Sequence, residues 1–363
     1  MSKNAIKPLP WFTSTLLHWH HTANNRQMPW KGETDAYKIW LSEVMLQQTR
    51  VEQGLPYYQR FVTALPTVQA LAAAPAEQVF KLWEGLGYYS RARNLMAAAR
   101  QVVEQYEGQF PNSYEQLLSL KGVGPYTAAA IASFAFGLPY AVVDGNVVRV
   151  LARFYGQHLP YDATEGKKWF ASQAQTLLAT QQPAAFNQAI MDLGATICKP
   201  VNPLCSLCPL QPQCRAFTEQ LIPQLPAKAK SIQRKSRYLL MLVVQHNQRW
   251  LVQERTGNDV WKHLHQFVTF EMQEMPLPKP RVAQKLALEQ YDLPVKVQSW
   301  FNPPSQALTH QTIQGLVAFC STPTAKKVPG MQWLTASQIS QKAFPRWLQP
   351  VIETILNKPL QRG

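Results

Sequence analysis

Four of the five cysteines in this 363-residue chain lie within 17 residues. The spacing is C-x6-C-x2-C-x5-C over Cys198, Cys205, Cys208 and Cys214. The close pair presents two thiolates from one turn, and the flanking two close a four-sulfur cage that suits zinc or an iron–sulfur cluster. No secretory signal or membrane-length apolar run is visible, so we expect metal ligation in a reducing compartment and not disulfides. Spacing alone does not choose the metal.

The apolar pattern divides the chain in two. From Trp11 to about Phe217, apolar residues recur at helical spacing between prolines, which predicts a set of short helices. Further on, residues 237–244 and 249–252 predict a β-hairpin, and 315–320, which contains Cys320, predicts a buried strand. We therefore expect a mostly α domain over 1–218, a basic linker over 219–236 and an α/β domain over 237–363.

Positive charge is present in each of these three parts. Lys and Arg outnumber Asp and Glu 36 to 21, and the net charge is +15. There are 18 basic and 14 acidic residues in 1–220, four and none in 221–236, and 14 and seven in 237–363. This distribution favours two domains that hold one polyanion, with nucleic acid as the commonest such partner. Charge that only keeps the fold soluble is an equally good interpretation of the balance itself.

A glycine pair points to the mode of nucleic-acid contact. Gly122 and Gly124 lie between two helical runs, in the segment Leu120 to Tyr126. Two glycines let the backbone approach a phosphate, and the following helix N-terminus offers unpaired N–H groups. A plain tight turn is the alternative, but in a basic chain the pattern favours a helix-hairpin-helix that grips DNA phosphates without reading sequence.

Two acids are candidates for catalysis. Glu43 is surrounded by apolar neighbours that would desolvate it and raise its pKa toward the general-acid range. Glu43 and Gln47 are four residues apart on one helix, so both face a cleft or both face solvent. Asp144 follows an apolar run and precedes an amphipathic helix, where a helix N-cap is the simpler interpretation.

Together these residues resemble the helix-hairpin-helix, iron–sulfur DNA glycosylases and, within them, the adenine DNA glycosylases of the MutY type. The resemblance covers nearly the whole chain. Besides the hairpin and the cysteines, it rests on Met28-Pro29-Trp30, the runs 40–49 and 85–93, Asp144-Gly145-Asn146-Val147 and Met191-Asp192-Leu193-Gly194.

This resemblance implies a helical catalytic domain over 1–218 with a 4Fe-4S cluster on the loop 198–214. It also implies a Nudix-like domain over 237–363 that inspects the base opposite the adenine. Glu43 would protonate adenine at N7 and activate water, and Asp144 would stabilise the oxocarbenium ion. Tyr126 and Asn146 would hold Asp144 and the water in place.

The resemblance also predicts the residues that contact DNA. Gln48 and Tyr88 are the candidate wedges that fill the gap left by the flipped base. Thr309 is expected to accept the N7 proton of 8-oxoguanine, with His310 bracing the loop or contacting a phosphate. The predicted DNA-binding residues are Arg26, Trp30, Lys31, Gln48, Tyr88, Arg91, Gly122, Gly124, Thr309 and His310.

The chain departs from the family pattern at several positions. Lys31 stands where the family usually has Arg, Lys121 where it has Pro, and Leu308 where it has Phe. Tyr126 stands where bifunctional relatives such as endonuclease III carry a nucleophilic lysine, and a phenol forms no Schiff base. Residues 281–293 lack the glutamate cluster of Nudix hydrolases, which disfavours pyrophosphohydrolase activity.

The expected function is therefore monofunctional excision of adenine paired with 8-oxoguanine or guanine in duplex DNA. The expected protein is a monomer in the bacterial cytoplasm, on the nucleoid, without membrane contact. Two alternatives remain. One is a bifunctional, endonuclease III-like glycosylase and lyase for damaged pyrimidines, and the other is a noncatalytic DNA-binding protein, which would require loss of the acid pair.

Overall fold

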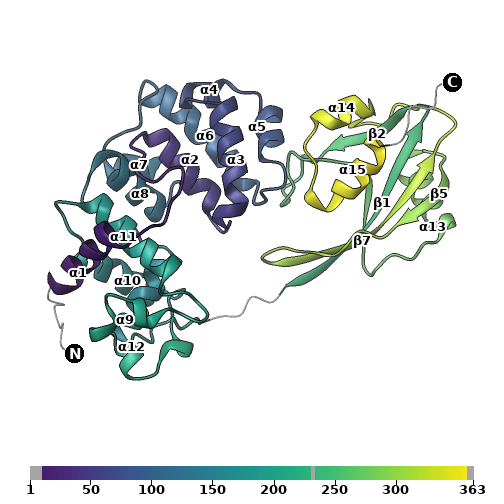
Figure 1. Cartoon of the computed structure of the whole chain (residues 1–363). Coiled ribbons are helices and arrows are strands. Elements are labelled where there is room, and N and C mark those ends of the chain that lie inside the picture. The colour runs from purple at the N-terminus through teal and green to yellow at the C-terminus, as the bar shows by residue number, and fades with distance from the viewer. Residues whose placement is uncertain (1–9, 230–233, 358–363) are drawn as a thin grey trace. The chain divides into compact units, whose positions relative to one another are not determined.

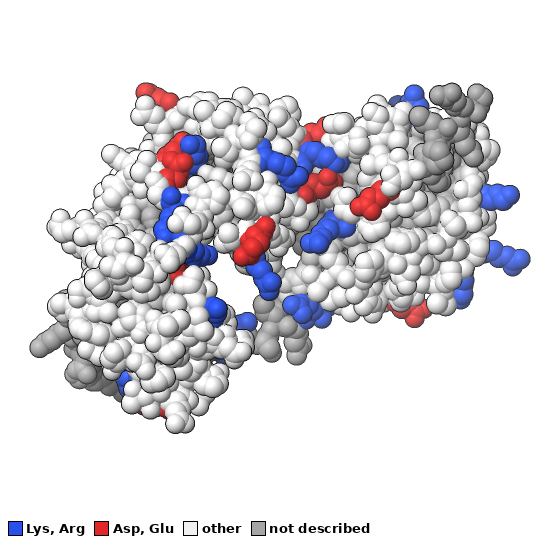
Figure 2. All heavy atoms as spheres, in the orientation of Figure 1, with Lys and Arg blue, Asp and Glu red and all other residues white. Residues whose placement is uncertain are grey.

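The computed structural model describes residues 10–229 and 234–357 and divides the chain into two compact units (Figure 1). The first unit comprises Met1–Ala73 and Ala97–Ser231, and the second comprises Ala74–Met96 and Ile232–Gly363. Residues 230–233 of the predicted linker lie outside the described residues. Figure 2 shows Lys and Arg side chains on the surface of both units.

The first unit is helical, as predicted. Its helices are α1 (Pro10–Thr22), α2 (Ala36–Leu46), α3 (Val51–Ala64), α4 (Val68–Ala73), the later part of α6 (Ser90–Gln105), α7 (Tyr114–Ser119), α8 (Pro125–Phe136), α9 (Gly145–Tyr155), α10 (Thr164–Leu177), α11 (Pro183–Thr196) and α12 (Arg215–Thr218). Side-chain caps begin several of them. Asp35 accepts a hydrogen bond from the Tyr37 N–H at the start of α2, and Ser113 accepts one from the Gln116 N–H at the start of α7.

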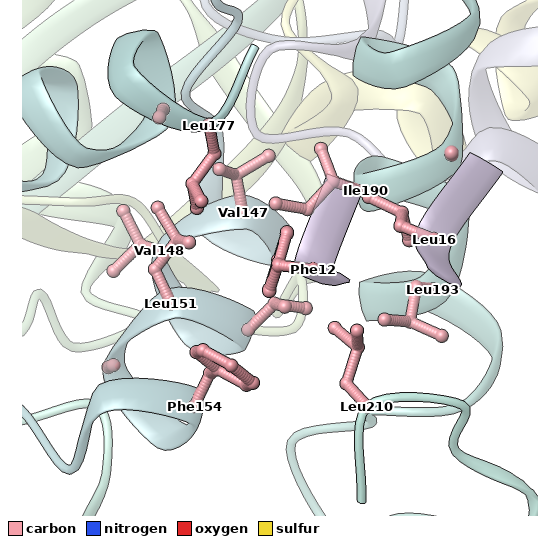
Figure 3. Close-up of a cluster of buried hydrophobic side chains, with 14 of the residues drawn as sticks. Phe12, Leu16, Val147, Val148, Leu151, Phe154, Leu177, Ile190, Leu193 and Leu210 are labelled. Atoms are coloured by element: carbon pink, nitrogen blue, oxygen red, sulfur yellow. The ribbon is translucent and has the colours of Figure 1, made fainter. Parts of the chain in front are cut away.

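A buried apolar cluster fixes the helix that carries Asp144 at its start. Helix α9 contributes Val147, Leu151 and Phe154, which pack with Phe12 of α1 and Leu193 of α11 (Figure 3). All five side chains are at most 5 % exposed. Burying a side chain of this size stabilises the fold by about 1.5–3 kcal/mol, so the N-terminus of α9 rests on a rigid base.

Helices α7 and α8 form the predicted hairpin. Gly122 adopts φ +77°, a left-handed conformation that glycine accommodates without steric cost. Gly124 is the N-cap of α8, with Pro125 at the first helical position. A Cβ atom built on Gly124 would meet nothing within 4 Å, so this glycine leaves open space beside the backbone.

The second unit is a mixed sheet with flanking helices, as the change of pattern after residue 236 predicts. The strands are β1 (Lys235–His246), β2 (Arg249–Glu254), β3 (His265–Gln266), β4 (Val268–Met272), β5 (Lys296–Phe301), β6 (Gln306–Ala307), β7 (Gln311–Ser321) and β8 (Met331–Thr335). The main order is β3-β2-β1-β7-β5, with β4 paired to β1, β6 to β7 and β8 to β2. Only β1 and β7 pair in parallel among these strands of the described chain.

The predicted hairpin is the antiparallel pair β1 and β2, and the predicted strand 315–320 lies within β7. Cys320 is 1 % exposed in the core of this unit, as expected. The helices of the unit are α5 (Ala76–Trp83), the first part of α6, α13 (Pro280–Tyr291), α14 (Ala336–Gln341) and α15 (Gln349–Leu356). Figure 1 shows α13 beside β5 and α14 beside α15.

Polar contacts attach α5 to the C-terminal part of this unit. The Phe344 N–H donates to Glu84 Oε1 at 2.8 Å, and Lys81 Nζ donates to the Lys342 carbonyl at 3.0 Å. The Lys342 ammonium in turn pairs with Glu77 at 2.8 Å. These contacts hold residues 74–96 to the rest of the second unit. Within the described ranges, no helix combines the length and apolarity needed to cross a membrane.

We predict that Gly315→Ala destabilises the second unit. Gly315 pairs with Leu239 in the parallel ladder, and a Cβ atom there would lie 2.1 Å from the Leu239 carbonyl oxygen. Forcing the two strands apart should lower the free energy of unfolding by about 1–3 kcal/mol in a urea titration. Gly257→Ala is the control, since its Cβ would meet nothing within 4 Å. Equal midpoints for the two variants would contradict the prediction.

Candidate active site

A cavity of about 750 Å³ in the first unit brings the candidate acids together. Its lining comes from α2, the start of α8, the segment 143–146, α11 and the loop 26–34. Glu43 and Gln47 both line it, so the face of α2 that carries them points into a cleft and not into solvent. Gln47 Nε2 donates to Thr127 Oγ1 at 3.3 Å, which holds α2 against α8.

Glu43 is nearly removed from solvent, with 7 % exposure. Its pKa is raised to about 7, mainly by burial and also by the negative charge of Asp144. The Tyr126 hydroxyl donates a hydrogen bond to Glu43 Oε2, and this bond opposes the rise. The desolvation expected from the apolar neighbours of Glu43 is thus present, and its carboxyl group can hold a proton near neutral pH.

Asp144 has more hydrogen-bond donors than Glu43. Its Oδ1 accepts the Val147 N–H at 2.8 Å, and its Oδ2 accepts the Asn146 side-chain amide at 2.6 Å. Burial raises the pKa of Asp144, while these bonds and the Arg149 charge oppose the rise. Asp144 is the N-cap of α9, as the sequence predicts, and its side chain also lines the cavity.

Arg149, which the sequence analysis did not identify, supports the Asp144 carboxylate through the Asn146 side chain. Its Nη2 donates to Asn146 Oδ1 at 2.8 Å and to the Gly194 carbonyl at 2.7 Å, and its Nε donates to the Cys198 carbonyl at 2.6 Å. A Cβ atom on Gly194 would lie 2.9 Å from the Asn146 carbonyl oxygen. Only glycine allows this approach of α11. An arginine among the apolar residues of α9 was the available signal.

Arg26 and Lys31, both predicted to contact DNA, meet at a carboxylate to which the sequence gave no role. Asp192 is fully buried, and its oxygens lie 2.8 Å from Arg26 Nη1 and 3.4 Å from Lys31 Nζ. Asn24 and Gln188 donate their amides to the same carboxylate at 2.8 Å and 2.9 Å. This cluster fixes one wall of the cavity and balances part of its positive charge.

The remaining aromatic and amide candidates occupy two different units. Trp30 is 9 % exposed and lines the cavity, packed edge-on against Tyr58. Gln48 also lines it, with a left-handed φ of +58°. Tyr88 belongs to the second unit, has φ +49° and is 45 % exposed. Non-glycine residues seldom adopt this conformation, and such strain is concentrated at functional sites.

Arg91 occupies a different environment from the DNA surface expected from the sequence. Its side chain is buried, its Nη2 donates to the Gly87 carbonyl at 3.1 Å, and its guanidinium lies over the rings of Trp83 and Tyr88. Burial lowers its pKa to about 10. Arg91 therefore braces the Tyr88 turn, and its predicted contact with DNA stays a prediction.

Thr309 and His310 lie in the turn between β6 and β7. The Thr309 hydroxyl is 2.8 Å from the Tyr88 hydroxyl. His310 is exposed, and its carbonyl accepts the Lys235 N–H at 3.0 Å. The structure thus brings one candidate wedge and the candidate lesion-contact residue together within the second unit.

The four clustered cysteines follow α11 and are half-buried. The pKa of the Cys208 thiol is raised to about 12, mainly by burial and also by the charges of the other three sulfurs. Arg153 donates to Cys198 Sγ at 3.5 Å. No three His, Cys, Asp or Glu side chains in 10–229 and 234–357 are arranged as a metal site. The donor set of four neighbouring sulfurs nevertheless fits a thiolate-bound metal.

The chain is similar to known DNA repair proteins. Residues 41–168 match the model of the HhH-GPD superfamily of base excision DNA repair proteins. An adenine DNA glycosylase of Buchnera aphidicola subsp. Baizongia pistaciae is 36 % identical over 71 % of this chain and 74 % of the relative. The adenine DNA glycosylase of Homo sapiens is 46 % identical over 56 % of this chain and 39 % of that protein. The structure of a thermostable thymine-DNA glycosylase matches with a TM-score of 0.53 and 32 % identity, over 57 % of this chain and 95 % of that one.

The raised pKa of Glu43 predicts a pH-dependent stability. The unfolded carboxyl group ionises near 4.5 and the folded one near 7, so the folded state binds the proton more strongly in this window. This stabilisation is complete below about pH 4.5 and is lost as the pH rises through 7. Glu43→Gln should therefore gain about 3 kcal/mol relative to the parent protein between pH 4.5 and pH 8, measured by urea unfolding.

Glu52→Gln on α3 is the matched control, since Glu52 is exposed. Its unfolding free energy should follow that of the parent protein at both pH values. A constant difference between Glu43→Gln and the parent protein across this range would contradict the desolvation argument.

Proposed function

This chain belongs to the adenine DNA glycosylases of the HhH-GPD superfamily, and we propose that it excises adenine opposite 8-oxoguanine or guanine in duplex DNA. Enzymes of this kind hydrolyse an N-glycosidic bond in base excision repair. The observation that carries the proposal is the buried pair Glu43 and Asp144, which share one cavity and have different hydrogen-bond partners. This pairing supplies an acid and a charge stabiliser in the same site.

Glu43 acts as the general acid in this proposal. Adenine is a poor leaving group until it is protonated, and a carboxyl with a pKa of about 7 carries a transferable proton at neutral pH. Once ionised, the same carboxylate can take a proton from the attacking water. Tyr126 keeps it in place by donating its hydroxyl to Oε2.

Asp144 stabilises the positive charge that develops on the sugar. Departure of the base leaves an oxocarbenium-like centre, which a fixed carboxylate in a site of low dielectric stabilises strongly. The two hydrogen bonds to Asp144 favour its ionised form and hold its orientation. Asn146, itself held by Arg149, completes the support.

The same site disfavours the bifunctional alternative. A lyase needs an amine that attacks the sugar to form a Schiff base. Tyr126 stands at the corresponding position, and its hydroxyl is committed to Glu43. We infer that the chain cleaves the base from the sugar and leaves the strand intact.

DNA contact uses groups in both units. The α7–α8 hairpin would bind phosphate through the open backbone at Gly124 and the N-terminus of α8. Gln48 and Tyr88 would fill the gap left by the flipped base, and Thr309 would accept the N7 proton of 8-oxoguanine. The surface carries Lys and Arg on both units (Figure 2). We propose a monomer that acts on chromosomal DNA in the cytoplasm.

Cys198, Cys205, Cys208 and Cys214 would hold a 4Fe-4S cluster. Support comes from the four-sulfur donor set and from the family. The cluster would crosslink the loop after α11 and so fix the backbone at Cys198, whose carbonyl receives Arg149 Nε. Its contribution would be to folding and DNA affinity more than to the chemical step.

Substitution of the two acids tests the function. Glu43→Gln should reduce excision from an adenine:8-oxoguanine duplex by at least about 100-fold, because an amide cannot donate the proton. Asp144→Asn should lose about 100- to 1,000-fold, since asparagine caps a helix equally well but carries no charge. Alkali cleavage of the abasic product measures the rate, with duplex affinity measured in parallel.

Glu52→Gln serves as the control and should excise normally. Substantial excision by Glu43→Gln would remove Glu43 as the acid. Normal excision by Asp144→Asn would leave Asp144 as a helix cap alone. Loss of duplex affinity by either variant would point to misfolding instead of lost chemistry.

The cluster assignment predicts a coloured protein. The purified protein should contain about four iron atoms and absorb broadly in the visible. Cys208→Ser should lose iron and DNA affinity together, because a missing thiolate opens the cage. Cys320→Ala is the matched control, since Cys320 lies in the sheet core, and it should keep its iron. A colourless, fully active protein with stoichiometric zinc would overturn the assignment.

A further inference from the structure

Two groups proposed for separate tasks on DNA are hydrogen-bonded to each other. The hydroxyls of Tyr88 and Thr309 lie 2.8 Å apart, although 221 residues separate them in the chain. We propose that Tyr88 is a positioning residue for opposite-base recognition: its hydroxyl holds Thr309 at the edge of the wedge ring. This inference rests on the proposed function, in which Thr309 contacts the lesion.

The tyrosine side of this pair is held firmly. Gly87 and Tyr88 adopt φ +80° and +49°, which form a tight turn before α6. The Gly87 carbonyl accepts Trp83 Nε1 at 3.0 Å and Arg91 Nη2 at 3.1 Å. The Arg91 guanidinium also lies 5.4 Å from the centre of the Tyr88 ring. The ring is therefore fixed by the turn while 45 % of the residue stays exposed.

The threonine side has a fixed backbone. The Leu308 N–H donates to the Gln311 carbonyl at 2.7 Å, and the Leu308 carbonyl accepts Arg234 Nε at 2.9 Å. The Thr309 side chain is not held by these bonds. Within the described ranges, Tyr88 is its hydrogen-bond partner. The rotamer of Thr309 thus depends on the Tyr88 hydroxyl.

This bond limits what the threonine hydroxyl can offer to a base. A free hydroxyl has one proton and two lone pairs, and it rotates to suit either a donor or an acceptor. At N7, 8-oxoguanine is a donor, whereas guanine is an acceptor. Either hydroxyl can be the donor in this contact. When Thr309 donates its proton to the Tyr88 oxygen, the Thr309 oxygen keeps its lone pairs but has no free proton, so it can only accept from a base.

Fixing the oxygen favours the lesion for a geometric reason. In the proposed complex, a base beside the Tyr88 ring would lie next to the Thr309 oxygen, which is 2.8 Å from the phenol oxygen. Because the Tyr88 hydroxyl already holds the Thr309 side chain, an N7 proton would meet an acceptor that is in position. Binding would then cost no further side-chain freedom of Thr309. Without the Tyr88 hydroxyl, Thr309 can rotate and donate to the N7 of guanine. The preference for 8-oxoguanine should then narrow.

Single-turnover excision with adenine opposite 8-oxoguanine or opposite guanine tests the proposal in the full-length protein. The measured quantity is the ratio of the two rate constants. Tyr88→Phe keeps the ring and removes the hydroxyl, and Thr309→Val keeps the shape and removes the hydroxyl. Each should narrow the ratio by about three- to tenfold, the range expected for one hydrogen bond. The double variant should be no worse than either single variant, because the two hydroxyls act as a unit.

Two further variants serve as controls. Thr309→Ser retains the hydroxyl, so its ratio of the two rate constants should stay close to that of the parent protein. Tyr106→Phe removes a tyrosine hydroxyl directly after the other end of α6 and should leave the ratio unchanged. An unchanged ratio in Tyr88→Phe, or losses that multiply in the double variant, would overturn the positioning role. An unchanged ratio in Thr309→Val would instead refute lesion contact by Thr309, and the positioning role with it.

Discussion

The guanidinium of Arg149 joins three parts of the catalytic unit that no other described group connects in the same way. It reaches the Asn146 side chain, the Gly194 carbonyl and the Cys198 carbonyl at 2.6–2.8 Å. The bond to the Gly194 carbonyl is buried, and an unmet buried acceptor costs about 1–3 kcal/mol. The position of Asp144, which accepts the Asn146 amide, therefore depends on how α11 and the cysteine loop are folded. The cavity that contains Asp144 and the loop that carries the cysteines thus share one structural support.

The two carboxyl groups in the cavity, those of Glu43 and Asp144, lie in different hydrogen-bonding environments. Glu43 lies in the interior of α2, where the backbone N–H groups are used by the helix, and a phenol is its side-chain donor. Asp144 lies at the start of α9, where unpaired backbone N–H groups and the helix dipole favour negative charge. Burial raises the pKa of both groups. The two carboxyl groups differ in their hydrogen-bond donors, so the position of each acid in its helix suits it to the role proposed for it.

Structural features that depend on residues close together in the sequence could be predicted from the sequence. The glycine pair at Gly122 and Gly124 indicated the hairpin, and Asp144 before an amphipathic run indicated a cap that the structure confirms. Contacts between distant residues gave no local signal. Asp192 reads as one acid in an apolar stretch, and only the fold brings two cations to it. Arg91 follows a turn, where arginines are usually exposed, but it is buried beside the ring of Tyr88 in that turn and the ring of Trp83 at the end of α5.

The two proposed wedges share a left-handed backbone conformation, and this conformation affects the free-energy cost of base flipping. Gln48 and Tyr88 are both left-handed at φ, which costs a non-glycine residue roughly 1–2 kcal/mol. Hydrogen bonds around each turn maintain this strain, from the Thr49 N–H to Leu46 and from the Arg91 N–H to Tyr88. Extruding a base costs a few kcal/mol more. Because the backbone at both wedges is already fixed in the folded protein, filling the gap in the stack would require little further ordering of the backbone. The favourable free energy of folding offsets this backbone strain, so the free energy of DNA binding does not have to offset it.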